Sequence, residues 1–160
     1  MNENKPDLVQ INEFLVAGLS VRTINSDEFN PGKAKLSKLW DDFFSTNMAN
    51  SIPYRTPNSP IFGVYSNYSS DASDFYTVTA GVNISQEMGD LEFNTVAIQS
   101  GDYLVFRDKG LIPEIVIRTW GRIWEYFADD NAPQRRFGTD FELYVSTDEI
   151  AIYIGINNSH

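Results

Sequence analysis

The residue of clearest chemical interest is a glutamate in a strand-like segment near the end of the chain. Phe141, Leu143 and Val145 point to one side of this segment, because side chains alternate along a β-strand. Glu142 and Tyr144 share the other side. A carboxylate between two large apolar residues is either part of a solvated outer face or a buried group that binds a ligand. The segment alone leaves both interpretations open, although charged side chains are mostly exposed.

The composition is that of one folded, acidic domain. The chain has 160 residues, of which 42% are hydrophobic and 14% aromatic, which is typical of a globular protein and not of a disordered one. Its formal net charge is −10 and its pI is about 4.4, so a nucleic-acid-binding surface is not expected. The overall field favours cationic or basic partners over anions.

Few residues could support catalysis. The sequence has no cysteine, which excludes disulfides, thiolate metal sites and cysteine nucleophiles. Its single histidine is the last residue, His160, so one chain cannot assemble a Ser-His-Asp triad or a histidine-based metal site. Neither a phosphate-binding lysine loop nor a dinucleotide-binding glycine pattern is present. We therefore expect no catalytic residues, no metal and no cofactor.

The ends of the chain bear on its location and its domain boundaries. The N-terminus lacks the basic and then apolar pattern of a signal peptide, and no apolar run approaches the length of a membrane span. These features predict a cytoplasmic protein that does not contact a membrane. Residues 1–12 are polar and are expected to form a loose lead-in to a single ligand-binding domain over residues 13–160.

The spacing of apolar residues predicts two helices among several strands. One helix is expected over residues 33–46, and a second over residues 113–129 with Pro113 in its first turn, where proline is tolerated. The predicted strands cover residues 14–24, 61–67, 75–84, 93–107 with a bend near Gly101, 140–146 and 150–156.

The two halves of the chain, residues 13–86 and 92–157, both follow the order β-α-β-β and align with one another. The first helix matches the second with Leu36 on Trp120, Leu39 on Ile123, Trp40 on Trp124 and Phe43 on Phe127. Although apolar periodicity allows any two helices to be aligned, two further strand pairs match in the same order, which favours an internal repeat. We predict an α+β fold with pseudo-two-fold symmetry, in which an antiparallel sheet of about eight strands and two main helices surround a central cleft.

The repeat gives Glu142 a specific place in this fold. Its counterpart in the first half is Gly63, so the carboxylate occurs once per cleft. A charged residue that occurs in only one of two symmetry-related halves favours the ligand-binding interpretation over the solvated one.

The sequence resembles the GyrI-like small-molecule-binding domain, which is also the effector-binding half of several AraC-type and multidrug-sensing transcription activators. The resemblance covers about residues 14–156, and similar free-standing domains occur among integron cassette proteins. It is carried by segments along the whole chain: 14–19, 39–43, 61–65, 100–106, 119–124, 140–144 and 150–156.

This resemblance implies a pocket for hydrophobic, often cationic, aromatic compounds, with Glu142 as the counter-ion of the ligand. The physical chemistry agrees, because a carboxylate in an apolar cleft loses its solvation unless a charged partner meets it. A large organic cation is weakly hydrated and also buries apolar area.

Aromatic residues near Glu142 are the further candidates for ligand binding. Tyr144 and Tyr153 are expected to share the face of Glu142 if the last two strands form a hairpin, and Tyr65 is the repeat mate of Tyr144. The helix aromatics could instead belong to the core, since apolar residues at helical spacing usually do. They are Trp40, Phe44, Trp120 and Trp124.

Two other functions remain open. In one, Glu142 acts as the general base of a hydrolase of reactive small molecules, although no partner acid can be assigned. In the other, the domain binds a protein, as a gyrase-inhibitor module does. No helix-turn-helix precedes residue 14, so any role in transcription would require a separate DNA-binding regulator as partner.

Overall fold

The computed structural model describes residues 6–28, 30, 32–70, 74–86, 93–112 and 114–157. Pro113 and His160, which entered the sequence-based predictions, lie outside these residues. The strands are β1 (Asp7–Ile11), β2 (Phe14–Thr23), β3 (Ile61–Ser66), β4 (Tyr76–Ile84), β5 (Asn94–Ile98), β6 (Gly101–Lys109), β7 (Asp140–Ser146) and β8 (Glu149–Gly155). The helices are α1 (Asn25–Glu28), α2 (Leu36–Ser45) and α3 (Glu114–Phe127), with a 3₁₀ turn at Met48–Asn50.

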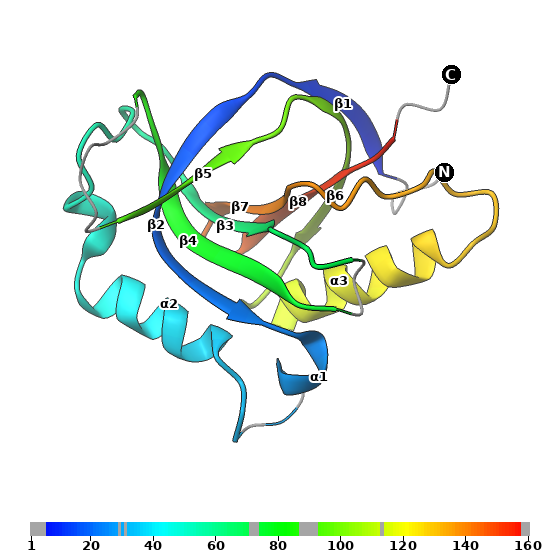
Figure 1. Ribbon diagram of the computed structural model, residues 1–160, viewed down its shortest axis with the longest axis horizontal. Helices are drawn as coiled ribbons and strands as arrows, with labels where there is room; N and C mark the ends of the chain where they lie inside the picture. The colour runs from blue at the N-terminus through cyan, green and yellow to red at the C-terminus, as the bar shows by residue number, and fades with distance from the viewer. Residues whose placement is uncertain are drawn as a thin grey trace.

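The strands of the described chain form one antiparallel, curled sheet (Figure 1). Its order is β1-β6-β8-β7-β3-β4-β2-β5, which reads symmetrically outward from the central pair β7 and β3. The α+β class, the eight-strand sheet and the two main helices are therefore as predicted. In the β3–β7 pair, Gly63 lies directly opposite Glu142. Since these two residues are also repeat mates, the pseudo-two-fold axis passes between them.

The repeat unit is one strand longer than predicted. The expectation of a loose lead-in over residues 1–12 is wrong for β1, which pairs with β6 from Asp7↔Val105 to Ile11↔Gly101. In the same way β5 pairs with β2 of the other half. Each half is therefore β-β-α-β-β, and each half gives its first strand to the edge of the other. The segment predicted as one bent strand is β5 and β6, separated at residues 99–100.

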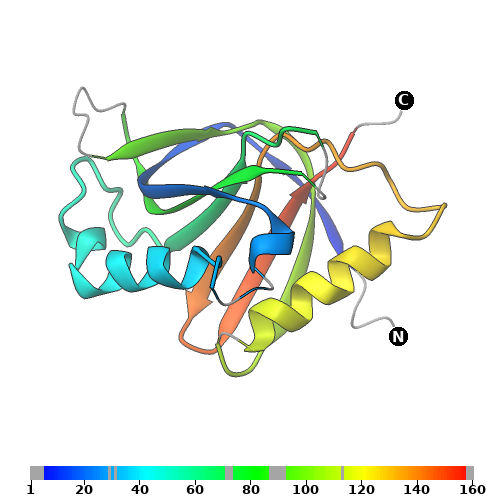
Figure 2. The ribbon, with the colours of Figure 1, turned by 60° about the horizontal axis from the view of Figure 1, so that its bottom comes forward.

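Both main helices pack on the same face of the sheet, which we call the helix face (Figure 2). In α2, Leu39 and Phe43 are buried one turn apart, over a cluster that includes Ala17, Val78 and Ala80. In α3 the buried residues Ile115 and Ile123 cover the isoleucines of β8. Among the described residues no helix is long and apolar enough to cross a membrane.

A third apolar cluster fills the opposite face of the sheet. Phe62 and Phe141 lie there, as does Tyr103, all almost fully buried. Because residues alternate along a strand, the neighbours of Phe62 and Phe141, namely Gly63 and Glu142, face the helices. The alternation predicted for β7 therefore holds, and it directs Glu142 to the space between α2 and α3.

Candidate functional site

A cavity of about 400 Å³ opens on the helix face and draws its wall from both halves of the molecule. This is within the size range of small-molecule pockets. We call it the helix-face cavity, and its wall is mostly apolar and aromatic. It is lined by Asn25, Glu28, Leu36, Tyr65, Tyr68, Tyr76, Val116, Ile117, Trp120, Trp124 and Arg135.

Glu142 lies directly behind this wall. Only 2% of the residue is exposed, and its carboxylate accepts three hydrogen bonds. The hydroxyl of Tyr65 and the indole Nε1 of Trp120 donate to Oε2 over 2.8 and 2.7 Å, and the hydroxyl of Tyr144 donates to Oε1 over 2.8 Å. Two of the three donors, Tyr65 and Trp120, are themselves lining residues, so their side chains connect the carboxylate to the cavity.

The protonation states follow from burial. Burial raises the pKa of Glu142, and the hydrogen bonds from Trp120, Tyr144 and Tyr65 oppose that rise because they stabilise the carboxylate. Burial and the nearby Glu142 charge raise the pKa values of Tyr65 and Tyr144 well above normal. Both phenols therefore stay protonated near neutral pH and remain hydrogen-bond donors.

Gly63 provides the room that Glu142 occupies. A Cβ atom at position 63 would lie 2.8 Å from Oε1 of Glu142 and 3.0 Å from Cζ2 of Trp40. Both distances are shorter than ordinary contacts, so any larger residue would force these side chains to move. The glycine of one half thus accommodates the carboxylate that its repeat mate carries in the other half.

A second buried carboxylate lies two residues earlier on β7. Asp140 is fully buried and forms an ion pair with Arg135, with 2.7 Å between Nη2 and Oδ2. Its other partners are the Tyr68 hydroxyl and the backbone N–H of Gly155. The Arg135 guanidinium also stacks over the ring of Phe137, with 4.5 Å between Cζ and the ring centroid. Asp140 therefore has a cationic partner within the protein, whereas the described partners of Glu142 are all neutral.

The structure brings most of the predicted site residues together. Tyr65, Trp120 and Trp124 line the helix-face cavity. Tyr144 is not part of the lining, but it donates a hydrogen bond to Glu142. Trp40 is a supporting residue, since it packs edge-on against Tyr144 with 5.2 Å between ring centroids and is partly buried against the core cluster that α2 covers.

Two predicted site residues lie elsewhere. Tyr153 does not share the face of Glu142, because it pairs with Phe141 in the sheet register and stacks on that ring at 4.4 Å on the opposite face. The residue across from Glu142 is Ile152. Phe44 is 61% exposed and is not part of the cavity lining. It stacks on Trp40 with 5.7 Å between the ring centroids.

Several lining residues were missed in the sequence. Tyr76 could have been found, since alternation along β4 puts it on the same face as Val78 and Ala80. Tyr68 and Arg135 lie in loops, where no periodicity indicates direction. Glu28 is the last residue of the short α1. Its carboxylate accepts hydrogen bonds from the backbone N–H groups of Lys35 and Leu36, which caps α2 beside the cavity.

Comparison with known proteins agrees with this architecture. Residues 4–156 match the model of the GyrI-like small molecule binding domain, so the chain belongs to that family. The chain is 35% identical to the integron cassette protein VCH_CASS2 from the mobile metagenome of Vibrio cholerae, with a TM-score of 0.84 and 96% of each chain covered.

Two further relatives extend the comparison. YobU of Bacillus subtilis (strain 168), whose name describes a transcriptional regulator, is 33% identical over 132 residues, which is 80% of this chain and 79% of that protein. SAV2435, whose structure was solved bound to tetraphenylphosphonium, has a TM-score of 0.76 at 14% identity, with 96% and 94% of the two chains covered. The second likeness shows a shared fold.

Proposed function

We propose that this domain binds lipophilic organic cations in the helix-face cavity, with Glu142 as the counter-ion. The observation that carries the proposal is a buried carboxylate whose described partners are three neutral donors. Removing a carboxylate from water is costly unless a cation compensates it. Glu142 is therefore ready to be compensated by a ligand, in contrast to Asp140, which Arg135 already neutralises.

The wall of the cavity selects among cations. Small inorganic ions and ammonium groups are strongly hydrated, and a wall in which apolar and aromatic side chains predominate offers few groups to replace that water. An aromatic or amphipathic cation spreads its charge over a large apolar surface, and burying that surface is favourable at about 25 cal/mol per Å². Its size is limited by the cavity volume of about 400 Å³.

Tyr65 and Trp120 have a double role in this proposal. Each donates its polar hydrogen to Glu142 and also lines the cavity. A ring whose polar hydrogen binds an anion has a more negative face, which strengthens its attraction for a cation. Such contacts contribute about 0.5–2 kcal/mol each. The ligand charge is then held by these rings with the carboxylate behind them.

The similar proteins support a proposal for the biological use of binding. The chain is similar in sequence to a protein named as a transcriptional regulator and similar in fold to one solved with tetraphenylphosphonium. We infer that this chain either sequesters such compounds or reports their presence to a separate DNA-binding protein. Because the wall of the cavity is mostly apolar and the chain is acidic, direct binding to nucleic acid is not part of this proposed role.

A fluorescence titration tests the proposal, since Trp120 and Trp124 line the cavity. Tetraphenylphosphonium should quench the tryptophan emission with saturation, and the neutral triphenylphosphine oxide should do so only at much higher concentration. The ligands should be recovered chemically unchanged. Equal affinity for both compounds would contradict the counter-ion role, and conversion of an activated ester that Glu142→Gln abolishes would support the hydrolase alternative.

A further inference from the structure

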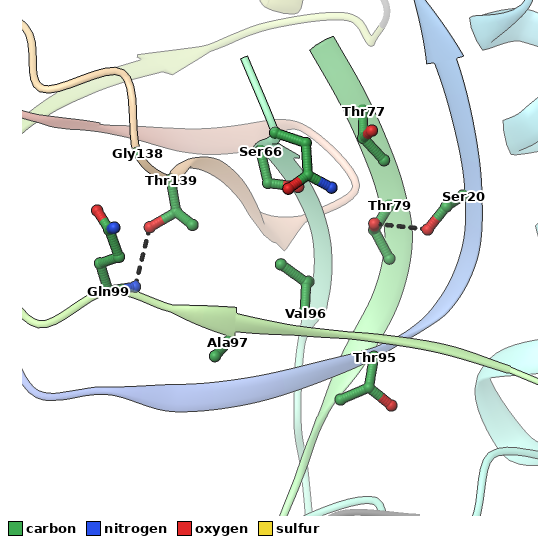
Figure 3. Close-up of a pocket in the computed structure, with 11 residues that line it drawn as sticks. Ser20, Ser66, Thr77, Thr79, Thr95, Val96, Ala97, Gln99, Gly138 and Thr139 are labelled. Carbon is green, nitrogen blue, oxygen red and sulfur yellow. Dashed lines mark hydrogen bonds between the residues drawn. The ribbon is translucent and has the colours of Figure 1, made fainter. Parts of the chain in front are cut away.

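A second cavity, of about 380 Å³, lies on the opposite face of the sheet (Figure 3). We call it the hydroxyl cavity, because hydroxyl and amide side chains predominate in its wall. Its lining residues are Ser20, Ser66, Asn67, Thr77, Thr79, Thr95, Val96, Ala97, Gln99, Gly138 and Thr139. They come from β2, β3, β4 and β5, from the residues that directly follow β3 and β5, and from the loop before β7.

The two cavities lie back to back on the same strands. Tyr65 lines the helix-face cavity, and the next residue of β3, Ser66, lines the hydroxyl cavity. Tyr76 and Thr77 of β4 are related in the same way. Since neighbouring side chains of a strand point to opposite faces, one sheet separates an aromatic cavity from a polar one.

Part of the polar wall is already hydrogen-bonded. Ser20 Oγ and Thr79 Oγ1 lie 2.7 Å apart and share one hydrogen, which leaves the other hydroxyl hydrogen of the pair available (Figure 3). Thr139 Oγ1 accepts from the backbone N–H of Gln99 over 2.9 Å and also bonds the Tyr103 hydroxyl. The wall is therefore ordered, and it still offers donors and acceptors to a ligand.

Ser66 is the least satisfied member of this wall. It is only 4% exposed, and its Oγ has no hydrogen-bond partner among the described residues. A buried hydroxyl without a partner is unfavourable, and buried polar groups in native proteins are nearly always paired. The cavity that Ser66 lines is the place from which a bound molecule can supply that partner.

We propose that the hydroxyl cavity binds a small neutral polyhydroxylated molecule of monosaccharide size. No lining residue is ionisable, so a charged ligand would lose hydration without gaining a counter-ion. An apolar ligand would bury the hydroxyl and amide groups without hydrogen bonds. A polyol can donate to and accept from the same hydroxyl groups, and the volume lies within the range of small-molecule sites.

Arginines near the cavity do not change this assignment. Arg22 donates to the Thr77 hydroxyl, the Asn67 carbonyl and the Ser69 hydroxyl. Arg136 donates to the Gln99 side chain and to the Ile156 carbonyl. These neutral acceptors hold both guanidinium groups outside the lining, where they position polar residues of the wall.

The test is a titration of ¹⁵N-labelled protein with D-glucose and D-ribose, followed by amide chemical shifts. The proposal expects saturable shifts at Ser66, Thr79 and Gln99, with those of Trp120 and Glu142 unchanged. Ser66→Ala and Thr79→Val should each weaken the affinity about three- to tenfold, the effect of one neutral hydrogen bond. Thr79→Val keeps the shape of the side chain, so it serves even if Ser66→Ala folds poorly.

Controls separate this site from the cation site and from general effects. Ser45→Ala, which removes an exposed hydroxyl from α2, should leave sugar binding unchanged. Ser66→Ala should bind tetraphenylphosphonium as wild type does. The proposal is overturned if neither sugar gives saturable shifts, if both cavity variants bind as wild type does, or if glucose 6-phosphate binds more tightly than glucose, since Arg22 would then select the ligand.

Discussion

Strand β7 carries two buried carboxylates that differ in one respect. Asp140 and Glu142 lie two residues apart on the helix face, are 0% and 2% exposed, and both accept a tyrosine hydroxyl. Asp140 also has the guanidinium of Arg135 at 2.7 Å, whereas Glu142 has only neutral partners among the described residues. One charge is neutralised by the fold itself and the other is left beside a cavity.

The difference between the two carboxylates indicates that Asp140 contributes to stability, whereas Glu142 is available for binding. An internal ion pair fixes the loop of Arg135 to Asp140, the first residue of β7, and breaking it would leave an uncompensated charge in the interior. At Glu142, by contrast, the uncompensated charge is retained, and three donors stabilise it enough to keep the fold intact. The free energy that a counter-ion would have contributed to folding is then available to a ligand.

The largest expected effect comes from removing the internal cation. Arg135→Met leaves Asp140 buried without its counter-ion, and the free energy of unfolding should fall by about 3–5 kcal/mol. Urea denaturation followed by circular dichroism measures this. As a control, Arg118→Met breaks an ion pair with Asp108 at an exposed arginine and should change the midpoint little. If Arg135→Met and Arg118→Met lowered the free energy of unfolding equally, Arg135 would not be an essential counter-ion of Asp140. The contrast between Asp140 and Glu142 would then fail.

A smaller effect is expected from filling the space beside Glu142. Gly63→Ala places a Cβ atom 2.8 Å from Oε1 of Glu142, so the carboxylate or Trp40 must shift, at a cost of about 1–3 kcal/mol. Gly121→Ala is the matched control in α3, because a Cβ atom there meets nothing within 4 Å. It should stabilise the helix by about 0.5–1 kcal/mol. If Gly63→Ala left the free energy of unfolding unchanged, the side chain of Glu142 would not be tightly held.

The smallest expected effect is a pH dependence of stability. Burial raises the folded-state pKa of Glu142 above its ordinary value of 4.5, so the folded protein holds this proton more tightly than the unfolded chain does. The stability contributed by this group is therefore full below about pH 4.5 and is lost as the pH rises through the raised pKa. Glutamine does not ionise, so the stability of Glu142→Gln does not decrease in this way as the pH rises.

The measurement is the difference in unfolding free energy between Glu142→Gln and wild type from about pH 4 to about pH 8. As the pH rises, the variant should become more stable relative to wild type. Glutamine can keep the hydrogen bonds of Tyr65 and Trp120 on its carbonyl oxygen and donate to Tyr144, so the network itself is preserved. A pH-independent difference would mean that Glu142 has an ordinary pKa.

Much of the site could be predicted because the chain repeats itself. The alignment of Gly63 with Glu142 indicated one carboxylate per cleft, and the structure places these two residues opposite each other on the pseudo-two-fold axis. Helix spacing also gave the buried positions Leu39 and Ile123 correctly. Periodicity is a local property, and it predicts which face a residue takes wherever the element is regular.

What could not be predicted depends on register and on loops. The face of Tyr153 is fixed by its pairing with Phe141, and a shift of one residue would have brought it to Glu142. The short segment that forms β1, in which Leu8, Val9 and Ile11 are apolar, is held by β6, which is remote in sequence. Arg135 reaches Asp140 from an irregular segment. Each of these features is decided by tertiary contacts that no local pattern encodes.

The central claim is that the charge of Glu142 selects cations, and calorimetric titration of wild type and Glu142→Gln tests it most directly. Tetraphenylphosphonium should bind the variant about 30- to 150-fold more weakly, since a charge pair at about 6 Å contributes roughly 2–3 kcal/mol at an effective dielectric constant of about 20. The affinity for triphenylphosphine oxide should stay within about twofold of wild type, because its contacts are apolar. An unchanged affinity for the cation, or an equal loss for both compounds, would contradict the account.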